Sequence, residues 1–151
     1  MINKIKITLF TCLLLLCSCS KQSSKAEYLQ SDENEQNNYP FSEAVKAGDI
    51  LYLSGQIGTS SENDGGLVSG GIREETRQTM LNIKNTLEKY DSKMDDIIKC
   101  TCMLVDIKEW AAMSEEYIKF FPNHKPARSA FAGTGLALGA RVEIECIAKI
   151  D

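Results

Sequence analysis

The sequence predicts a single α+β domain with the element order β-β-α-β-α-β-β. Short segments alternate apolar and polar side chains with the period of two that is typical of half-buried strands, and two longer segments repeat apolar side chains at helical spacing. Because the helices interrupt the strands only twice, we expect one sheet with both helices on the same face. About 110 residues carry these patterns, which is the size of one domain.

The first two strands are expected at residues 44–47 and 50–54. Gly48-Asp49 between them is typical of a tight hairpin turn. Gly55 follows the second strand, where a glycine indicates either a bulge or a close approach of the backbone to a ligand. Residues 59–71 are rich in Gly, Ser, Asn and Asp and are expected to form a loop.

Two amphipathic helices are expected. The first spans residues 72–90, with a core-facing stripe of Ile72, Thr76, Met80, Ile83, Leu87 and Tyr90. The second begins near Asp106, a plausible cap, and ends before Pro122. Its stripe contains Trp110, Met113, Tyr117 and Phe120 or Phe121. We expect the aromatic side chains of this stripe, including Trp110, to lie in the core.

The segment 97–105 is the clearest strand, with Ile98, Cys100, Cys102 and Leu104 on one face. The chain has six cysteines, and three of them precede residue 20. The remaining three are an odd number that fits no disulfide framework, so we expect Cys100, Cys102 and Cys146 to be buried thiols. Nor do they form a metal site, because His124 is the one histidine of the chain and no second cysteine pair occurs.

The N-terminus is expected to be an export signal rather than part of the fold. Lysines near the start precede an apolar run too short to span a bilayer comfortably. The run ends in Leu16-Cys17-Ser18-Cys19, which resembles the lipobox of bacterial lipoproteins, with Cys19 as the lipidated residue. The alternative is a plain secretory signal. We therefore expect a signal peptide at residues 1–18 and a location in the cell envelope, held to a membrane through the lipid anchor alone.

Residues 19–38 are expected to form the lipidated cysteine and a flexible tether, since polar residues dominate and little apolar surface is available for burial. The folded domain then spans residues 39–151. The net charge of −4 offers no basic surface for nucleic acid. If both helices cover one sheet face, the other face needs a partner.

Two segments near the C-terminus carry the candidate chemistry. Arg128 follows a proline in an extended segment, and Glu143 lies in an alternating Val-Glu-Ile-Glu strand. If these strands lie side by side, the guanidinium can grip a carboxylate with its planar fork while the glutamate handles a proton or a water. The alternative is a structural Arg–Glu pair between two strands.

Four stretches together resemble the Rid family, the reactive intermediate deaminases or YjgF-like proteins. They are Pro126-Ala127-Arg128-Ser129-Ala130-Phe131 with Val142-Glu143-Ile144-Glu145, Ala44–Asp49 running into Leu53–Ile57, and Thr76-Arg77-Gln78 opening a helix. The resemblance extends from about Tyr39 to Ile150. It implies a chorismate-mutase-like fold and a homotrimer with ligand clefts between subunits.

The resemblance also implies an enzyme that hydrolyses enamines and imines, such as 2-aminoacrylate, to 2-oxo acids and ammonia. By position, Arg128 would bind the substrate carboxylate and Glu143 would act on water. Ser54 and Gly55 would border the cleft, and Ser114 stands where many members have an asparagine. The resemblance implies no cofactor and no metal, while the acidic net charge is the reason that no nucleic acid partner is expected.

Two positions depart from the family pattern. Phe41 stands where many deaminating members have a tyrosine, and Ala130 replaces a commonly larger residue next to the arginine. The enzymes that make aminoacrylate are cytosolic, whereas a lipoprotein works outside the cytoplasm. The alternative function is therefore a non-catalytic, membrane-tethered trimer that binds small carboxylates or a protein partner.

Overall fold

The structure, a computed structural model, describes residues 25–150. It is one mixed sheet in the strand order β1-β2-β3-β7-β5-β6, with β4 paired to β7. The strands are β1 (Glu27–Leu29), β2 (Ala44–Ala47), β3 (Ile50–Leu53), β4 (Gln56–Ile57), β5 (Ile97–Leu104), β6 (Ala127–Ala132) and β7 (Val142–Lys149). The helices are α1 (Asp32–Gln36), α2 (Ile72–Lys89) and α3 (Trp110–Tyr117). Over residues 25–150, no helix is both long enough and apolar enough to span a membrane.

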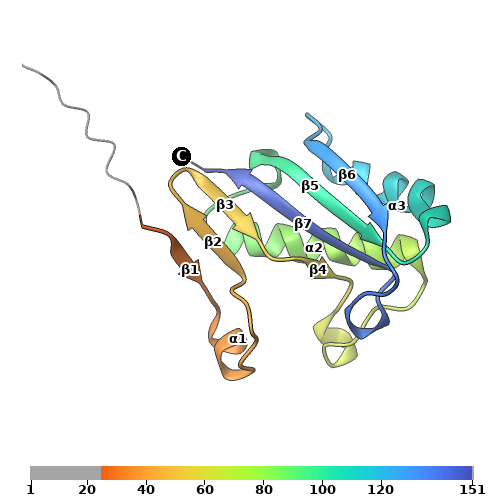
Figure 1. The fold of residues 1–151 in the computed structure, drawn as a ribbon, viewed down its shortest axis with the longest axis horizontal. Helices are drawn as coiled ribbons and strands as arrows, with labels where there is room; N and C mark the ends of the chain where they lie inside the picture. Colours follow the sequence, from red (N-terminus) through yellow and green to blue (C-terminus); the bar gives the residue numbers. More distant parts are fainter. Residues whose placement is uncertain (1–24, 151) are drawn as a thin grey trace, which may run out of the picture.

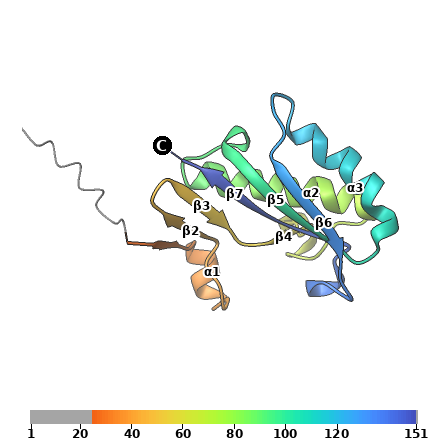
Figure 2. The ribbon, with the colours of Figure 1, turned by 45° about the horizontal axis from the view of Figure 1, so that its top comes forward.

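Helices α2 and α3 both pack on one face of the sheet (Figures 1 and 2). The predicted α+β class and the order β-β-α-β-α-β-β are confirmed by β2, β3, α2, β5, α3, β6 and β7. Alternate side chains of β5 and β7 face the helices and are fully buried, while the residues between them lie on the open face. The period of two seen in the sequence therefore separates a core face from an open face.

The stripe predicted along α2 is the part of the helix that enters the core. Its first five members are buried: Ile72, Thr76, Met80, Ile83 and Leu87. Glu74 and Glu75 in the first turn and Lys89 in the last turn complement the helix dipole. The amide of Asn82 donates to the carbonyls of Ile57 and Thr59, both at 3.0 Å, which fixes the end of β4 against the helix.

Strand β5 contains a bulge that the alternation did not predict. The register shifts between Ile97 and Lys99, so Ile98 is the extra residue on this strand. Ile97 therefore enters the core, whereas Ile98 is 47% exposed. The predicted core position of Ile98 is wrong, because the alternation holds only from Cys100 onward.

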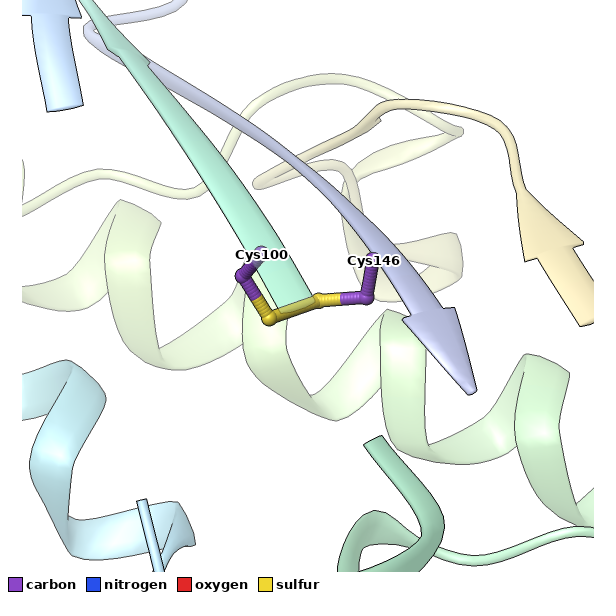
Figure 3. The surroundings of a disulfide bond; sticks show 2 residues. All are labelled: Cys100 and Cys146. Atoms are coloured by element: carbon purple, nitrogen blue, oxygen red, sulfur yellow. A yellow bond between two sulfur atoms is a disulfide. The ribbon is translucent and has the colours of Figure 1, made fainter. Parts of the chain in front are cut away.

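Cys100 and Cys146 form a disulfide that joins β5 to β7 (Figure 3). The two residues lie opposite each other in the antiparallel register, with a Cα–Cα distance of 4.2 Å. The prediction of three buried thiols is therefore wrong for this pair and correct for Cys102, which is free and buried. The odd number of cysteines does not exclude a disulfide, because the strand register decides which two cysteine side chains lie opposite each other.

The segment predicted to be a flexible tether is partly folded. Strand β1 pairs with β2, and α1 follows directly. Ser31 caps α1 by accepting from the backbone N–H of Asn34, and its hydroxyl donates to Glu43 at 2.7 Å. The boundary at Tyr39 is therefore wrong, because backbone pairing along the edge of β2 replaces the apolar burial that this segment lacks. Cys19 and residues 1–18 lie outside the described residues.

The open face of the sheet carries exposed aromatic side chains. Tyr52 is 47% exposed and Phe131 is 50% exposed, on strands near opposite ends of the sheet. Lys99 and Ser129 form a hydrogen bond on the same face, at 2.7 Å. Within residues 25–150, α2 and α3 cover the same face, as predicted, and the homotrimer that would cover the other face stays a prediction.

Candidate functional site

Arg128 lies on edge strand β6 and faces α3. It is opposite Cys100 in the parallel register, and this position puts it on the helix side of the sheet. Its guanidinium carbon lies 5.3 Å from the centre of the Trp110 ring and 5.0 Å from that of the Tyr117 ring. The two aromatic rings hold the planar cation without consuming its hydrogen-bond donors. Within residues 25–150 Arg128 has no carboxylate partner, so its fork is available to a ligand.

Trp110 and Tyr117 have different exposures, and only one matches the prediction. Tyr117 is buried at 3% exposure, whereas Trp110 is 45% exposed. The prediction that Trp110 belongs to the core is wrong. Trp110 begins α3 at the rim of the fold, where its ring contacts Arg128 instead of the apolar interior.

Ser114 lies on α3 and shares a groove with Arg128. The groove has a volume of about 550 Å³. It is lined by Trp110, Ala111, Ser114, Glu115, Tyr117, Ile118, Lys125, Pro126 and Arg128. Among the described residues, the hydroxyls of Ser114 and Tyr117 are shielded from solvent and have no hydrogen-bond partner.

Ala130 lies two residues after Arg128 and on the same side of β6. It is opposite Cys102 and packs against the edge of the core. Its methyl group offers no hydrogen bond, so any polar contribution to ligand binding here comes from other side chains. We refer to Ser114, Arg128 and Ala130, with Trp110 and Tyr117, as the arginine half-site.

Glu143 lies on the open face of β7, between two buried neighbours. Burial raises the pKa of its carboxyl, and the nearby negative charge of Glu145 raises this pKa further. In the described part of the chain it has neither a hydrogen bond nor an ion pair. A half-buried carboxylate with a raised pKa and a free oxygen is suited to accept a proton from water.

Gly55 is the residue against which the Glu143 carboxylate packs. A Cβ atom at position 55 would overlap a carboxylate oxygen of Glu143 and lie 3.0 Å from its carboxyl carbon. Both interpretations of this glycine apply in part: three residues (53–55) oppose two on β7 between the Tyr52–Ile147 and Gln56–Ile144 pairs, which is a bulge, and the predicted approach to a ligand stays a prediction. The glycine is required because any side chain here would displace the carboxylate.

Ser54 and Phe41 lie close to Gly55 in the fold. The Ser54 hydroxyl donates to the carbonyl of Ser42 at 2.6 Å, and its backbone N–H donates to the carbonyl of Glu43. Phe41 is 51% exposed, and its ring stacks on that of Tyr39 with the centroids 5.6 Å apart. We refer to Phe41, Ser54, Gly55 and Glu143 as the glutamate half-site.

The structure does not bring Arg128 and Glu143 together within one subunit. Strand β5 lies between β6 and β7, so the two strands are not neighbours. Arg128 faces the helices, whereas Glu143 lies on the open face. The condition that the two strands lie side by side is therefore not met, and the same geometry excludes a structural ion pair between these residues within one subunit.

Sequence reasoning missed the role of Trp110 and Tyr117. Trp110, Ser114 and Ile118 are spaced four residues apart, which puts them on one side of α3 and the turn that follows it. The sequence instead predicts a core stripe that joins Trp110 and Tyr117 to Met113, because these side chains are apolar or aromatic at helical spacing. The proximity of Pro126 and Arg128 to this stripe depends on how β6 packs beside α3, and local spacing does not reveal that contact.

The comparisons with known proteins identify the family. A family model described as Endoribonuclease L-PSP matches residues 33–150. The chain belongs to this family, which includes the Rid or YjgF-like proteins.

The described residues contain no cluster of three His, Cys, Asp or Glu side chains that could ligate a metal ion.

Two curated relatives carry deaminase names. Reactive Intermediate Deaminase A of Arabidopsis thaliana chloroplasts is 34% identical over 133 residues, which cover 88% of this chain and 71% of the relative. The human 2-iminobutanoate/2-iminopropanoate deaminase is 37% identical over 109 residues, which cover 72% and 79%. Among solved structures, Escherichia coli TdcF with bound serine has a TM-score of 0.70 and 27% identity, covering 75% of this chain and 90% of TdcF.

Proposed function

We propose that this protein is an imine deaminase that hydrolyses small 2-imino acids to 2-oxo acids and ammonia. The observation that carries the proposal is the pair of half-sites, each of which presents one charged group without a protein partner in the described residues. Arg128 is an unpaired cation held by aromatic rings, and Glu143 is an unpaired carboxylate with a raised pKa. The deaminase names of two relatives support the same reaction.

The reaction needs little from the protein beyond these groups. Water adds to the imine carbon, so a C–O bond forms as the C=N π bond opens, and one water proton passes to the Glu143 carboxylate and from there to the nitrogen. The resulting carbinolamine then loses ammonia: the C–N bond breaks, the hydroxyl proton passes to the leaving nitrogen, and the remaining oxygen forms the C=O bond of the 2-oxo acid. Arg128 fixes the substrate carboxylate, which orients the imine carbon toward the water.

A complete site requires the two half-sites to come from different subunits. A ring with a heterologous interface joins one surface patch of a subunit to a different patch of the next subunit. We infer a homotrimer in which the arginine half-site of one subunit faces the glutamate half-site of its neighbour. The helix-free sheet face and its exposed aromatic residues support such an interface.

The remaining candidate residues take supporting roles in this arrangement. Gly55 leaves room for the Glu143 carboxylate, and Ser54 fixes the segment that carries Phe41. Ser114 lines the groove beside Arg128. Ala130 contributes only space. The family model is named for an endoribonuclease, but a net charge of −4 favours small carboxylates over RNA as ligands.

Mixing two inactive variants tests the composite site. Arg128→Ala and Glu143→Gln are each expected to lose turnover of 2-aminoacrylate generated in situ. When the two are unfolded, mixed equally and refolded, about a quarter of the sites of random trimers combine an intact arginine with an intact glutamate. Activity should therefore recover to about that fraction of wild type.

Two other results would each be decisive. If the mixture stays inactive while wild type treated in the same way recovers, the site does not span subunits. If wild type binds 2-oxo acids but hydrolyses no imine, the non-catalytic binding function replaces the enzyme.

We also propose that the protein is a lipoprotein of the cell envelope, with Cys19 lipidated. The Cys100–Cys146 disulfide supports an oxidising compartment, because such bonds are rare in the reducing cytosol. Cys19→Ser is expected to release the protein from membranes, whereas Cys17→Ser should not. If Cys17→Ser releases the protein and Cys19→Ser does not, the lipid is on Cys17.

A further inference from the structure

Strand β4 is too short to fix its own position beside β7. It has two residues, and it pairs with β7 through Gln56–Ile144 and Ile57–Glu143. Strands of globular proteins usually have about 3–10 residues, so a two-residue ladder needs support from outside the sheet. The position of β4 matters for the proposed function, because Ile57 lies opposite Glu143 and Gly55, which contacts the Glu143 carboxylate, directly precedes β4.

Helix α2 supplies this support through Asn82. The side-chain amide of Asn82 donates to the carbonyls of Ile57 and Thr59, both at 3.0 Å. Gln78 orients this amide, because its own side-chain amide donates to the Asn82 oxygen at 2.9 Å. With its oxygen occupied, the Asn82 amide directs its two N–H groups at the two carbonyls. The backbone opposite Glu143 is therefore held from the sheet face that the helices cover (Figure 1).

Helix α2 also holds the start of β7, through Glu75. A carboxylate oxygen of Glu75 accepts from the backbone N–H of Arg141 at 2.7 Å, one residue before β7 begins. Glu75 is 6% exposed, and in the described part of the chain this N–H is the only hydrogen-bond partner of its carboxylate. Burial of a carboxylate is costly, and a charge-assisted hydrogen bond offsets part of this cost. The bond fixes the backbone two residues before Glu143.

Glu75, Gln78 and Asn82 lie on one side of α2. They are spaced three and four residues apart, which is the spacing of neighbours on a helix surface. The approach of α2 to the end of β4 is close, because a Cβ atom at Gly58 would lie 2.9 Å from the Cα atom of Glu75. We refer to these three α2 residues as the α2 polar stripe. Since α2 contacts both β4 and β7, the stripe fixes the two strands relative to each other.

Building on the proposed function, we propose that Glu75 and Asn82 are positioning residues of the deaminase, which hold the Glu143 carboxylate where it can accept a proton from water. They act through the backbone of β4 and β7 and not through contact with the substrate. Among the described residues, the side chains of the α2 polar stripe form no hydrogen bond with the arginine half-site. Loss of a stripe residue should therefore slow hydrolysis without weakening the binding of a carboxylate to Arg128.

The first test compares turnover with binding in the purified full-length protein. Asn82→Ala removes both hydrogen bonds to β4 and should lower kcat/KM for 2-aminoacrylate about tenfold to a hundredfold. The affinity for pyruvate, measured by calorimetric titration, should stay within about threefold of wild type, because the arginine half-site is intact.

Asn85→Ala is the matched control for Asn82→Ala. Asn85 is an exposed residue of the same helix, and its side chain forms no hydrogen bond within residues 25–150. Equal turnover of the two variants, or a loss of pyruvate binding as large as the loss of turnover in Asn82→Ala, overturns the positioning role of Asn82.

A second series tests the bond to β7 and decides the proposal for Glu75 even if Asn82→Ala does not fold. Glu75→Ala should lower turnover at least about tenfold. Glu75→Gln keeps an oxygen that accepts from the Arg141 N–H, so it should retain at least about a third of wild-type turnover. If Glu75→Gln is as slow as Glu75→Ala, the hydrogen bond to the backbone is not what Glu75 contributes.

Mixed trimers show which half-site Asn82 serves. Asn82→Ala refolded with Arg128→Ala should recover about a quarter of wild-type turnover, because Asn82→Ala subunits still supply intact arginine half-sites. Asn82→Ala refolded with Glu143→Gln should not exceed the residual activity of Asn82→Ala alone, because both changes affect the glutamate half-site. A general structural defect would impair both half-sites of the Asn82→Ala subunit. Failure of both mixtures, when Arg128→Ala and Glu143→Gln do complement each other, therefore overturns the positioning role.

The outcomes separate this proposal from the proposed function. If wild type hydrolyses 2-aminoacrylate and both Asn82→Ala and Glu75→Ala keep its full turnover, the positioning role is overturned and the deaminase remains. If wild type hydrolyses no imine, both proposals are overturned. The comparison of turnover with pyruvate binding decides the positioning role whether or not the site spans subunits.

Discussion

The two half-sites hold their charged groups in opposite ways. Arg128 is a cation at an edge strand, and two aromatic rings position it without neutralising it. Glu143 is an anion on an inner strand, and it is positioned by the missing side chain of Gly55. The arginine half-site depends on the aromatic side chains of Trp110 and Tyr117, whereas the glutamate half-site depends on the absence of a side chain at Gly55.

The comparison shows why neither half-site is complete in one subunit. Each charged group keeps its free atoms because no oppositely charged side chain pairs with it in the described residues. An ordinary ion pair would satisfy both groups and leave nothing for a ligand. The arrangement therefore favours a ligand that carries a carboxylate to one half-site and a reactive carbon to the other.

The largest expected effect follows from removing the cation. Arg128→Ala should lower kcat/KM for imine hydrolysis about 30- to 1,000-fold, corresponding to about 2–4 kcal/mol of lost charge-assisted binding. Arg128→Lys should recover little, since a single ammonium cannot reproduce the bidentate fork. Steady-state kinetics with in situ imine generation gives the ratio.

A matched control is available on α2. Arg77 forms an exposed pair with Glu74, so Arg77→Ala should leave kcat/KM unchanged. If Arg128→Ala were no worse than this control, the arginine half-site would not bind the substrate carboxylate.

A smaller effect is expected at the glutamate half-site. Gly55→Ala places a methyl group where the Glu143 carboxylate lies, and the flexible side chain rather than the backbone must move. A displaced base should lower kcat about tenfold to a hundredfold with little change in the melting temperature. Gly133→Ala is the control, because a Cβ at position 133 meets no atom within 4 Å. Equal activity of these two variants would show that the position of the carboxylate is unimportant.

The smallest effect concerns pH. The pKa of Glu143 is raised by burial and by Glu145, so kcat/KM should fall as the pH drops through this pKa and the base becomes protonated. Glu145→Gln removes the repulsion and should shift the acid limb of the pH profile to lower pH. A shift to higher pH would contradict the assigned cause.

The effect of the Glu143 carboxyl on stability has the opposite pH dependence to its effect on kcat/KM. Because the pKa of Glu143 is higher in the folded state than in the unfolded state, its protonated form favours folding. This contribution is present at low pH and is lost as the pH rises through the folded-state pKa. Glu143→Gln is therefore expected to be inactive at neutral pH with a melting temperature equal to or above that of wild type. A lower melting temperature would indicate that Glu143 has a structural role.

The sequence by itself determined the core elements of the fold. The spacing of Met80, Ile83 and Leu87 allows only a helix with one buried stripe, and the alternation from Cys100 to Leu104 allows only a half-buried strand. Motif resemblance also identified Arg128 and Glu143. These features are local, since a side chain's direction follows from the period of its own element.

Only the tertiary structure decided which elements meet. The register of β5 and β7 pairs Cys100 with Cys146, and the place of β5 in the sheet separates Arg128 from Glu143. Strand β1 pairs with the edge of β2, although the side chains of β1 bury little apolar surface. Trp110 lies at the rim, where its ring contacts Arg128 of the edge strand β6. Each of these contacts joins segments far apart in the chain, and strand order and register are global properties that local periodicity leaves open.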